Sequence, residues 1–250
     1  MRKVKLPESF APNRCKDLLR LGGQHDGGYL VSKNDIKKTE VLLAFGINAD
    51  WNFEKDFNAV KSVPTYAYDA STTFKLFIKK SFGALFRLEL GKAITFPFKY
   101  LSLKRFFSGK RKHIRKFVGL SYENSHVSMG EVLEELNFSN IYVKMDIEGS
   151  EYRCLNPLIE HQNRICGAVI EFHNVDLHME RIKKFIAAFD LPIAHIHANN
   201  YQPNTEDGVP LVIEITFSRF GSFESNLASL PHELDGTNKP SAEEIQITFS

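Results

Sequence analysis

The chain has 250 residues, 43% of them hydrophobic, which is enough for one large α/β domain with a sizeable core. Its three cysteines are odd in number and lack metal-ligand spacing, which argues against a disulfide framework and a structural zinc site. Neither end joins a charged stretch to an apolar run, and no apolar run approaches the roughly 20 residues that cross a bilayer. We therefore expect a soluble, cytoplasmic protein folded as a single domain over residues 1–250.

The first expected elements are a short helix over Cys15 to Arg20 and a glycine-rich turn. In the segment Arg20 to Val31, Gly22-Gly23 and Asp26-Gly27-Gly28 flank the turn, and glycine pairs permit positive φ. This pattern predicts a hairpin-like loop. Phosphate binding by the glycines is an alternative, although no helix follows directly.

Val41 to Phe45 is a continuous apolar run that predicts a strand buried on both faces, and Gly46 ends it. An amphipathic helix over Asp50 to Val60 and a strand over Thr65 to Tyr68 follow, and that strand ends at Asp69. This order is the general dinucleotide-binding pattern, but the Gly-x-Gly-x-x-Gly signature is absent, which argues against a diphosphate-bearing cofactor. The Asp69 carboxylate could bind both hydroxyls of a ribose or cap the next turn.

Phe74 to Phe117 is a basic, aromatic-rich insertion. Residues 75–116 contain thirteen Lys and Arg against the single acid Glu89, a net charge of +12, which leaves −10 for the rest of a chain whose total is +2. One interpretation is a helical insertion, broken at Pro97 and Gly109, whose lysines are solvated. The other is a lid or docking surface for an anionic acceptor or an acidic membrane face. No RNA-binding module is recognisable, so we do not expect a nucleic-acid partner.

A strand over Arg115 to Leu120 and a helix over Met129 to Leu136 come next. Ser128 caps the helix, and Glu131, three residues later, completes a capping box. The helix leads into the segment that carries the densest acidic motif.

Ile141 to Met145 alternates apolar and other residues in a β-branched context, which predicts a short strand that ends at Asp146. Glu148 follows in the turn, and Ser150 is expected to cap a helix with Glu151 in its first turn. Ligands of open α/β sheets bind outside the carboxyl ends of the strands, so Asp146 and Glu148 are candidate site residues. Capping or solvating the turn is the alternative.

Ala168 to Phe172 predicts a buried strand that places Glu171 and His173 on one face. His173 is the first candidate general base and His197 the second, because imidazole titrates near neutral pH. Each could equally be a core histidine. Alternatively, Asp146, Glu171 and His173 could together hold a divalent cation.

The last elements are a helix over Leu177 to Phe189 and strands over Pro192 to His197 and Leu211 to Phe217. No helix separates the two strands, which predicts an antiparallel hairpin on the edge of the sheet. We expect the tail, Pro231 to Ser250, to lie over the surface.

Three segments carry a family resemblance: VKMDIEGSEYRCL (Val143 to Leu155), VSMGEVLEEL (Val127 to Leu136) and LLAFGINADWNFE (Leu42 to Glu54). DGGYLV (Asp26 to Val31) and LPHELDGTNKP (Leu230 to Pro240) add to it. Together they resemble the FkbM family of S-adenosylmethionine-dependent methyltransferases. The resemblance covers most of the chain except the basic insertion.

The resemblance implies an α/β class I methyltransferase (Rossmann-like) fold, with a seven-stranded, mostly parallel sheet whose last strand is antiparallel. It also implies O-methylation of sugars or sugar-containing compounds. Gly46 would belong to the first cofactor loop, Asp69 would bind the ribose, and Asp146 would lie beside the sulfonium. Ala44-Phe45 replaces the acid that usually precedes the first glycine, and Asn48 is the candidate substitute.

Three functions therefore remain. The leading hypothesis is a methyltransferase with S-adenosylmethionine, an optional Mg²⁺ and a small-molecule or glycan acceptor, with His173, His197 and Glu148 as catalytic residues. The second is a metal-dependent hydrolase that uses Asp146, Glu171 and His173. The third is a non-catalytic module that binds anions through the insertion.

Overall fold

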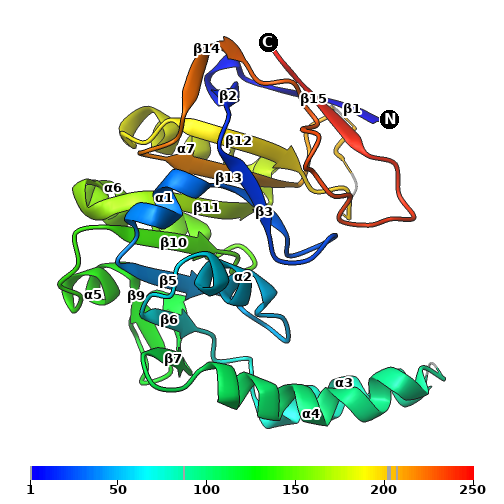
Figure 1. Ribbon diagram of the computed structural model, residues 1–250. Helices are drawn as coiled ribbons and strands as arrows, with labels where there is room; N and C mark the ends of the chain where they lie inside the picture. Colours follow the sequence, from blue (N-terminus) through cyan, green and yellow to red (C-terminus); the bar gives the residue numbers. More distant parts are fainter. Residues whose placement is uncertain (1, 87, 202–203, 207) are drawn as a thin grey trace.

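A computed structural model of the chain describes residues 2–86, 88–201, 204–206 and 208–250, with the backbone alone at 90, 92–94 and 97. A seven-stranded sheet runs through its centre (Figure 1). The strands, in spatial order, are β12 (Ile193–Ala198), β13 (Val212–Ser218), β11 (Ile165–His173), β10 (Ile141–Met145), β5 (Val41–Phe45), β6 (Thr65–Tyr68) and β7 (Arg111–Ile114).

The strand directions identify the fold class. From β7 through β6, β5 and β10 to β11, neighbouring strands are parallel. Strand β13 is antiparallel to both of its neighbours, β11 and β12. A parallel sheet with its last strand reversed and inserted beside the fifth is the class I methyltransferase arrangement, so the predicted fold class is confirmed. The predicted antiparallel hairpin on the edge of the sheet is confirmed, with β12 as the edge strand and β13 beside it.

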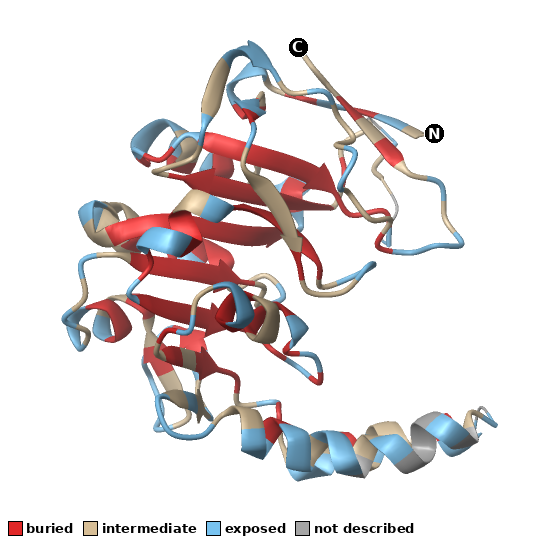
Figure 2. Cartoon of the chain, viewed as in Figure 1, coloured by how far each residue is buried: buried red, intermediate tan, exposed pale blue. Residues whose placement is uncertain are grey.

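Both faces of the sheet are buried (Figure 2), which explains the apolar runs of its central strands. Val41, Leu43 and Phe45 share one face and one hydrophobic cluster with side chains of three helices, and Leu42 and Tyr142 belong to a cluster on the other face. The helices of the first face are α5 (Met129–Glu134), α6 (Leu155–Glu160) and α7 (Val175–Ala188). The second face is covered by α1 (Lys33–Lys38), α2 (Asn52–Val60) and the hairpin of β3 (Leu18–Leu21) and β4 (Tyr29–Ser32).

Among the described residues, three further two-stranded sheets and three 3-10 helices complete the body. The pairs are β1 (Arg2–Leu6) with β15 (Ile245–Phe249), β2 (Asn13–Cys15) with β14 (Phe223–Leu227), and β8 (Phe117–Gly119) with β9 (His126–Ser128). The 3-10 helices are η1 (Glu8–Phe10), η2 (Glu151–Arg153) and η3 (Gln162–Arg164). The tail is therefore tied to the first strand rather than only laid over the surface.

Three local predictions need correction. The segment Cys15 to Arg20 is not helical, because it joins β2 to β3. The strand expected over Arg115 to Leu120 is shorter, because only β8 lies in this range, and it pairs with β9 rather than with the main sheet, whose strand β7 ends before it at Ile114. Ser150 makes no side-chain cap, because the short η2 precedes α6. The capping box of Ser128 and Glu131 is confirmed.

The first part of the basic insertion forms a helical hairpin, α3 (Phe74–Phe86) and α4 (Leu90–Phe106), which we call the arm, whereas its last part belongs to the body of the fold and contributes β7 to the main sheet. The arm projects from the sheet, and most of its surface is exposed (Figures 1 and 2). Its base is anchored by Phe77 and Leu103, which are buried in a cluster with Ile47 and Trp51. The helix α4 continues through position 97, where a break was predicted. Arg87 and the side chain of Lys92 lie outside the described residues.

Among the described residues, no helix combines the length and apolarity needed to span a membrane.

Candidate functional site

Two cavities lie at the carboxyl edge of the sheet. The larger, of about 590 Å³, is lined by residues that follow β5, β6 and β10 and by the segment 116–120. The smaller, of about 340 Å³, is lined by α2, the turn between β3 and β4, and the arm. Gly46, Asn48, Asp146 and Glu148 line both cavities and therefore mark the boundary between them.

Gly46, Asp69 and Asp146 occupy equivalent positions just beyond three neighbouring strands. Their backbone N–H groups extend the hydrogen bonding between neighbouring strands. Gly46 donates to the carbonyl of Tyr68, Asp69 to that of Ile114 and Asp146 to that of Phe45. All three line the larger cavity, so their predicted convergence is confirmed.

Gly46 is required by close packing. Its φ is +77°, and a Cβ there would lie 1.7 Å from the carbonyl oxygen of Asp146. The structure shows that this glycine makes room for the neighbouring strand.

The Asp69 carboxylate latches the first loop to the end of β6. Oδ2 accepts from the backbone N–H groups of Ile47 (3.1 Å) and Asn48 (2.7 Å), and from the Thr72 hydroxyl. Oδ1 accepts from the N–H and hydroxyl of Ser71 and from the N–H of Thr72. Burial opposes ionisation, but these hydrogen bonds lower the pKa of Asp69. Of its partners, only the hydroxyls of Ser71 and Thr72 can be replaced by ribose hydroxyls while the backbone hydrogen bonds that hold the loop remain.

Glu151 holds the acidic turn after β10. Its fully buried carboxylate accepts from the N–H groups of Ile147 and Gly149, each at 2.9 Å, and contacts Nδ1 of His173 at 3.1 Å. This support holds Glu148 in the left-handed region, with φ of +55°, and its side chain is 84% exposed. The turn therefore presents Glu148 to both cavities.

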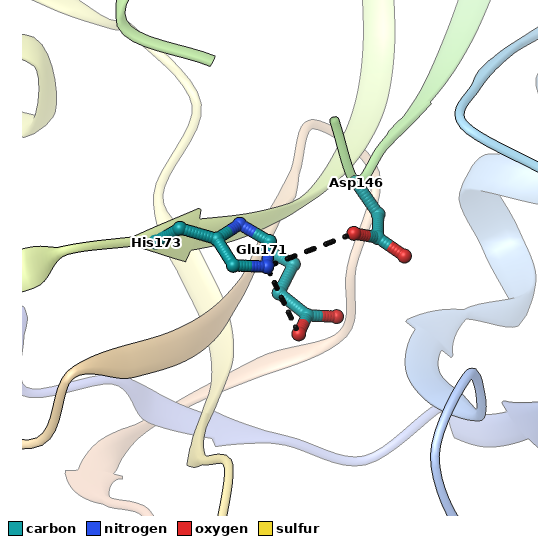
Figure 3. Close-up of side chains that lie close together, drawn as sticks. All are labelled: Asp146, Glu171 and His173. Atoms are coloured by element: carbon teal, nitrogen blue, oxygen red, sulfur yellow. Dashed lines mark ion pairs between the residues drawn. The ribbon is translucent and has the colours of Figure 1, made fainter. Parts of the chain in front are cut away.

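His173 lies among four carboxylates, two of which Figure 3 shows. Its Nε2 is 3.9 Å from Oδ1 of Asp146, 3.8 Å from Oε1 of Glu171 and 3.5 Å from Oε2 of Glu148. Burial alone lowers its pKa, but the hydrogen bond with Glu151 and the surrounding carboxylates raise the pKa of His173 to about 9. With no metal ion bound, the imidazole of His173 is therefore protonated at neutral pH and is a poor base.

Glu171 is buried between Tyr29 and Asn199. The Tyr29 hydroxyl donates to Oε2 at 2.7 Å and the Asn199 amide donates to Oε1 at 3.1 Å. Burial, followed by the charges of Asp146 and Glu214, raises the pKa of Glu171 well above its ordinary value. The predicted placement of Glu171 and His173 beside Asp146 is confirmed.

The prediction that His197 acts as an alternative base is corrected by its surroundings. His197 is 3% exposed, and its two ring nitrogens contact Glu214 (3.3 Å) and Glu244 (3.1 Å). Burial alone lowers its pKa, but these contacts raise the pKa of His197 to about 10. His195 is likewise bonded to Asp235, at 2.8 Å. Neither histidine lines the two cavities, so neither joins the site.

Two functional candidates were missed in the sequence. Lys144, on β10, is 6% exposed, donates to the carbonyl of Gly46 at 2.5 Å and lies 3.6 Å from Oδ2 of Asp146. Burial opposes its charge, but the acids around it raise the pKa of Lys144. Glu54, on α2, is 1% exposed, and neither carboxylate oxygen has a hydrogen-bond partner among the described residues.

Of these two residues, Lys144 alone left a signal in the sequence. A lysine inside a strand of otherwise apolar residues indicates a charged partner at the sheet. Burial raises the pKa of Glu54 to about 7. Its position could not be predicted, because nothing in the sequence of an amphipathic helix reveals which of its acids turns inward. Glu151 was expected only as a first-turn acid, although it organises the whole turn.

No protein-family model matches the chain, and no curated protein matches it. Among solved structures it is similar to an rRNA methylase from Streptococcus thermophilus, with 10% identity over 75% of this chain and 93% of that chain and a TM-score of 0.39. It is also similar to a precorrin-6y C5,15-methyltransferase from Geobacter metallireducens, with 11% identity over 74% of this chain and 85% of that chain and a TM-score of 0.39. At such low values these similarities carry nothing about activity, and the fold class rests on the order and direction of the seven strands.

Proposed function

We propose that the chain is an S-adenosylmethionine-dependent O-methyltransferase of the FkbM type that acts on a hydroxyl of a sugar or glycoconjugate. One observation carries the proposal: Gly46, Asp69 and Asp146, from three neighbouring strand ends, line one cavity of about 590 Å³. Small-molecule sites typically measure about 300–1,000 Å³. The motifs quoted above support the acceptor class.

The residues present fit this cofactor. The larger cavity, beside the Asp69 latch, would take the adenosyl group. The unpartnered carboxylate of Glu54 and the ammonium of Lys144 both line the smaller cavity and complement the charged amino-acid end. Glu54 would thus replace the acid that is missing before Gly46. When bound, S-adenosylmethionine supplies a methyl group on a positively charged sulfur.

The chain must also take a proton from the acceptor. As the oxygen–methyl bond forms and the sulfur–methyl bond breaks, the hydroxyl proton has to move to a base. Glu148 lines both cavities, and its carboxylate is exposed to them, so we assign it as the proton acceptor. His173, protonated at neutral pH, is assigned to positioning.

Calorimetry with S-adenosylmethionine and S-adenosylhomocysteine tests the proposal. We expect one molecule of either to bind per chain, and Asp69→Asn to weaken binding at least tenfold, because an amide cannot accept every hydrogen bond that the carboxylate accepts. The control is Asp190→Asn, an exposed carboxylate that precedes β12 at the opposite edge of the sheet. A folded protein that binds neither compound at millimolar concentration would contradict the assignment.

A second test uses Glu54→Gln. The neutral side chain keeps its volume but loses its attraction for an ammonium group, so we expect weaker binding of S-adenosylhomocysteine and little change for 5′-methylthioadenosine, which has no amino-acid end. An equal loss for both compounds would place Glu54 outside the amino-acid subsite.

A metal-dependent hydrolase is the second candidate function, because Asp146, Glu171 and His173 lie close together. Binding of S-adenosylhomocysteine separates the two functions, since a hydrolase has no need of that nucleoside. The acceptor class is tested by incubating the protein with S-adenosylmethionine and nucleotide-linked sugars, and by looking for a methylated sugar by mass spectrometry.

A further inference from the structure

Three ligand-type side chains meet where β10 and β11 end. Oxygen atoms of Asp146 and Glu171 and a ring nitrogen of His173 all lie within 4.8 Å of one another (Figure 3). The exposed Glu148 carboxylate faces the same imidazole nitrogen, at 3.5 Å.

The spacing of these atoms suits one small cation. Two ligands bound at about 2.1 Å are separated by about 3 Å when they are adjacent and by about 4.2 Å when they are opposite. The Nε2 atom of His173 is 3.9 Å from the Asp146 oxygen and 3.8 Å from the Glu171 oxygen, which lies within this interval. Binding would therefore need only small side-chain shifts.

The ligands are also held from behind. The contact between Nδ1 of His173 and Glu151 fixes the ring so that Nε2 faces the two acids. The hydroxyl of Tyr29 and the amide of Asn199 orient the Glu171 carboxylate. Such support from outer partners is a regular feature of protein metal sites.

The charge balance adds an independent reason. Asp146 has Lys144 at 3.6 Å, but Glu171 is 5% exposed and its partner among the described ion pairs is His173, at 3.8 Å, which loses its proton and its charge when it binds a metal. A buried carboxylate of this kind is stabilised by a cation bound directly to it.

We propose that Asp146, Glu171 and His173 bind one divalent cation of the Mn²⁺ class. An imidazole ligand favours Mn²⁺ over Mg²⁺, which prefers oxygen ligands and retains water. The site shares Asp146 with both cavities, so the cation would hold the acceptor hydroxyl at their boundary and lower its pKa. That use rests on the proposed function, but the binding of the cation does not.

The test is a titration of the chelator-treated, dialysed chain with Mn²⁺, followed by the electron paramagnetic resonance signal of free Mn²⁺. We expect one site per chain, weakened at least tenfold by Glu171→Gln and by His173→Gln. Glu151→Gln should weaken it less, because it changes only the support of a ligand. The control Glu134→Gln, an exposed acid on α5, should leave affinity unchanged.

Near-UV circular dichroism checks that each variant is folded. No saturable site, or a site that all folded variants retain at full affinity, would overturn the proposal. Titration of the metal-free protein with S-adenosylhomocysteine keeps the two proposals apart: binding there supports the cofactor assignment even if Mn²⁺ fails to bind.

A second inference comes from the arm. At its tip, Phe86 and Leu88 are 87% and 85% exposed, and Phe82 and Leu85 are exposed beside them. Lys75 and other cations lie along the same hairpin. Large exposed apolar groups next to clustered positive charge are typical of elements that enter the headgroup region of anionic membranes.

The base of the arm borders the site. Lys80 and Lys99 line the smaller cavity, and Lys80 donates to the side-chain oxygen of Asn48 at 3.1 Å. A surface bound by the arm would therefore lie next to the cavity.

We infer that the arm docks on an anionic phospholipid surface. Phe82 and Phe86 offer rings on which a base could stack, but Leu85 and Leu88 beside them do not, and this mixed apolar tip favours lipid over nucleic acid. Flotation of the full chain with vesicles of phosphatidylcholine containing phosphatidylglycerol should show binding that falls as salt rises. Vesicles of phosphatidylcholine alone should bind little.

The double variant Phe86→Ser and Leu88→Ser should reduce binding at least fivefold. The control Leu177→Ser changes an apolar residue on α7 that is also exposed and should have no effect. Equal binding to both kinds of vesicle would overturn the inference. Binding of a single-stranded oligonucleotide, with no binding to either kind of vesicle, would overturn it as well.

Discussion

At the carboxyl edge of the sheet, the acidic side chains of Asp69, Glu151 and Glu171 are buried, and each makes two or more hydrogen bonds or ion contacts. On the arm, dense positive charge lies on helices whose surface is mostly exposed (Figure 2). At the edge, charge is held in fixed geometry, which suits binding of a small ligand. On the arm it is solvated, which suits a large partner that brings the opposite charge. The predictions below test this difference.

The largest effect should come from Gly46, compared with Gly109, a glycine of similar positive φ. In Gly46→Ala the new Cβ would lie 1.7 Å from the Asp146 carbonyl, so we expect a loss of about 5 kcal/mol or more in the free energy of unfolding. In Gly109→Ala, beyond the arm, nothing lies within 4 Å and only the positive φ is strained, which should cost about 1 kcal/mol. Urea denaturation measures both. Similar losses in the two variants would mean that the backbone around Gly46 can move aside to accommodate the new Cβ.

An intermediate effect should distinguish the base of the arm from its tip. Phe77 is fully buried, so Phe77→Ala should lower the free energy of unfolding by about 3 kcal/mol through the cavity that it leaves. Phe86→Ala at the tip should change it by less than about 0.5 kcal/mol. Thermal unfolding checks the pair. A clear destabilisation from Phe86→Ala would show that the tip is packed rather than available to a partner.

The smallest effect should be pH-dependent and should come from His197. Its pKa is raised from an ordinary value near 6.5 to about 10 by Glu214 and Glu244, so its ion pairs stabilise the fold fully below pH 6.5. This contribution is lost as pH rises through about 10. His197→Gln should therefore cost about 2 kcal/mol at pH 6. The difference from the unmodified chain should shrink steadily towards pH 10. A difference that is constant with pH would mean that His197 is neutral in the folded chain.

Much of the framework could be predicted from residue patterns. The apolar run Val41 to Phe45 and the alternation of Ile141 to Met145 predicted two central strands, because a strand buried on both faces needs apolar side chains on both. The acids at their ends predicted which residues would meet. Asp69 and Asp146 do meet, because parallel strands end at a common edge.

Other features depended on contacts that no local pattern contains. His197 alternates like a site residue, but its position on the edge strand places it between Glu214 and Glu244. The burial of Glu54 follows from how α2 lies against β10, and the role of Glu151 follows from the return of β11 beside the acidic turn.

The sequence by itself determined the central strands β5, β6, β10 and β11, the position of the acidic turn and the charge of the arm, since each depends on neighbouring residues or on composition. Only the tertiary structure decided that Gly46 faces a carbonyl, that Asp69 is a latch and that His173 lies among carboxylates. These are distances between segments up to about a hundred residues apart, and they are set by how the strands align when the core packs.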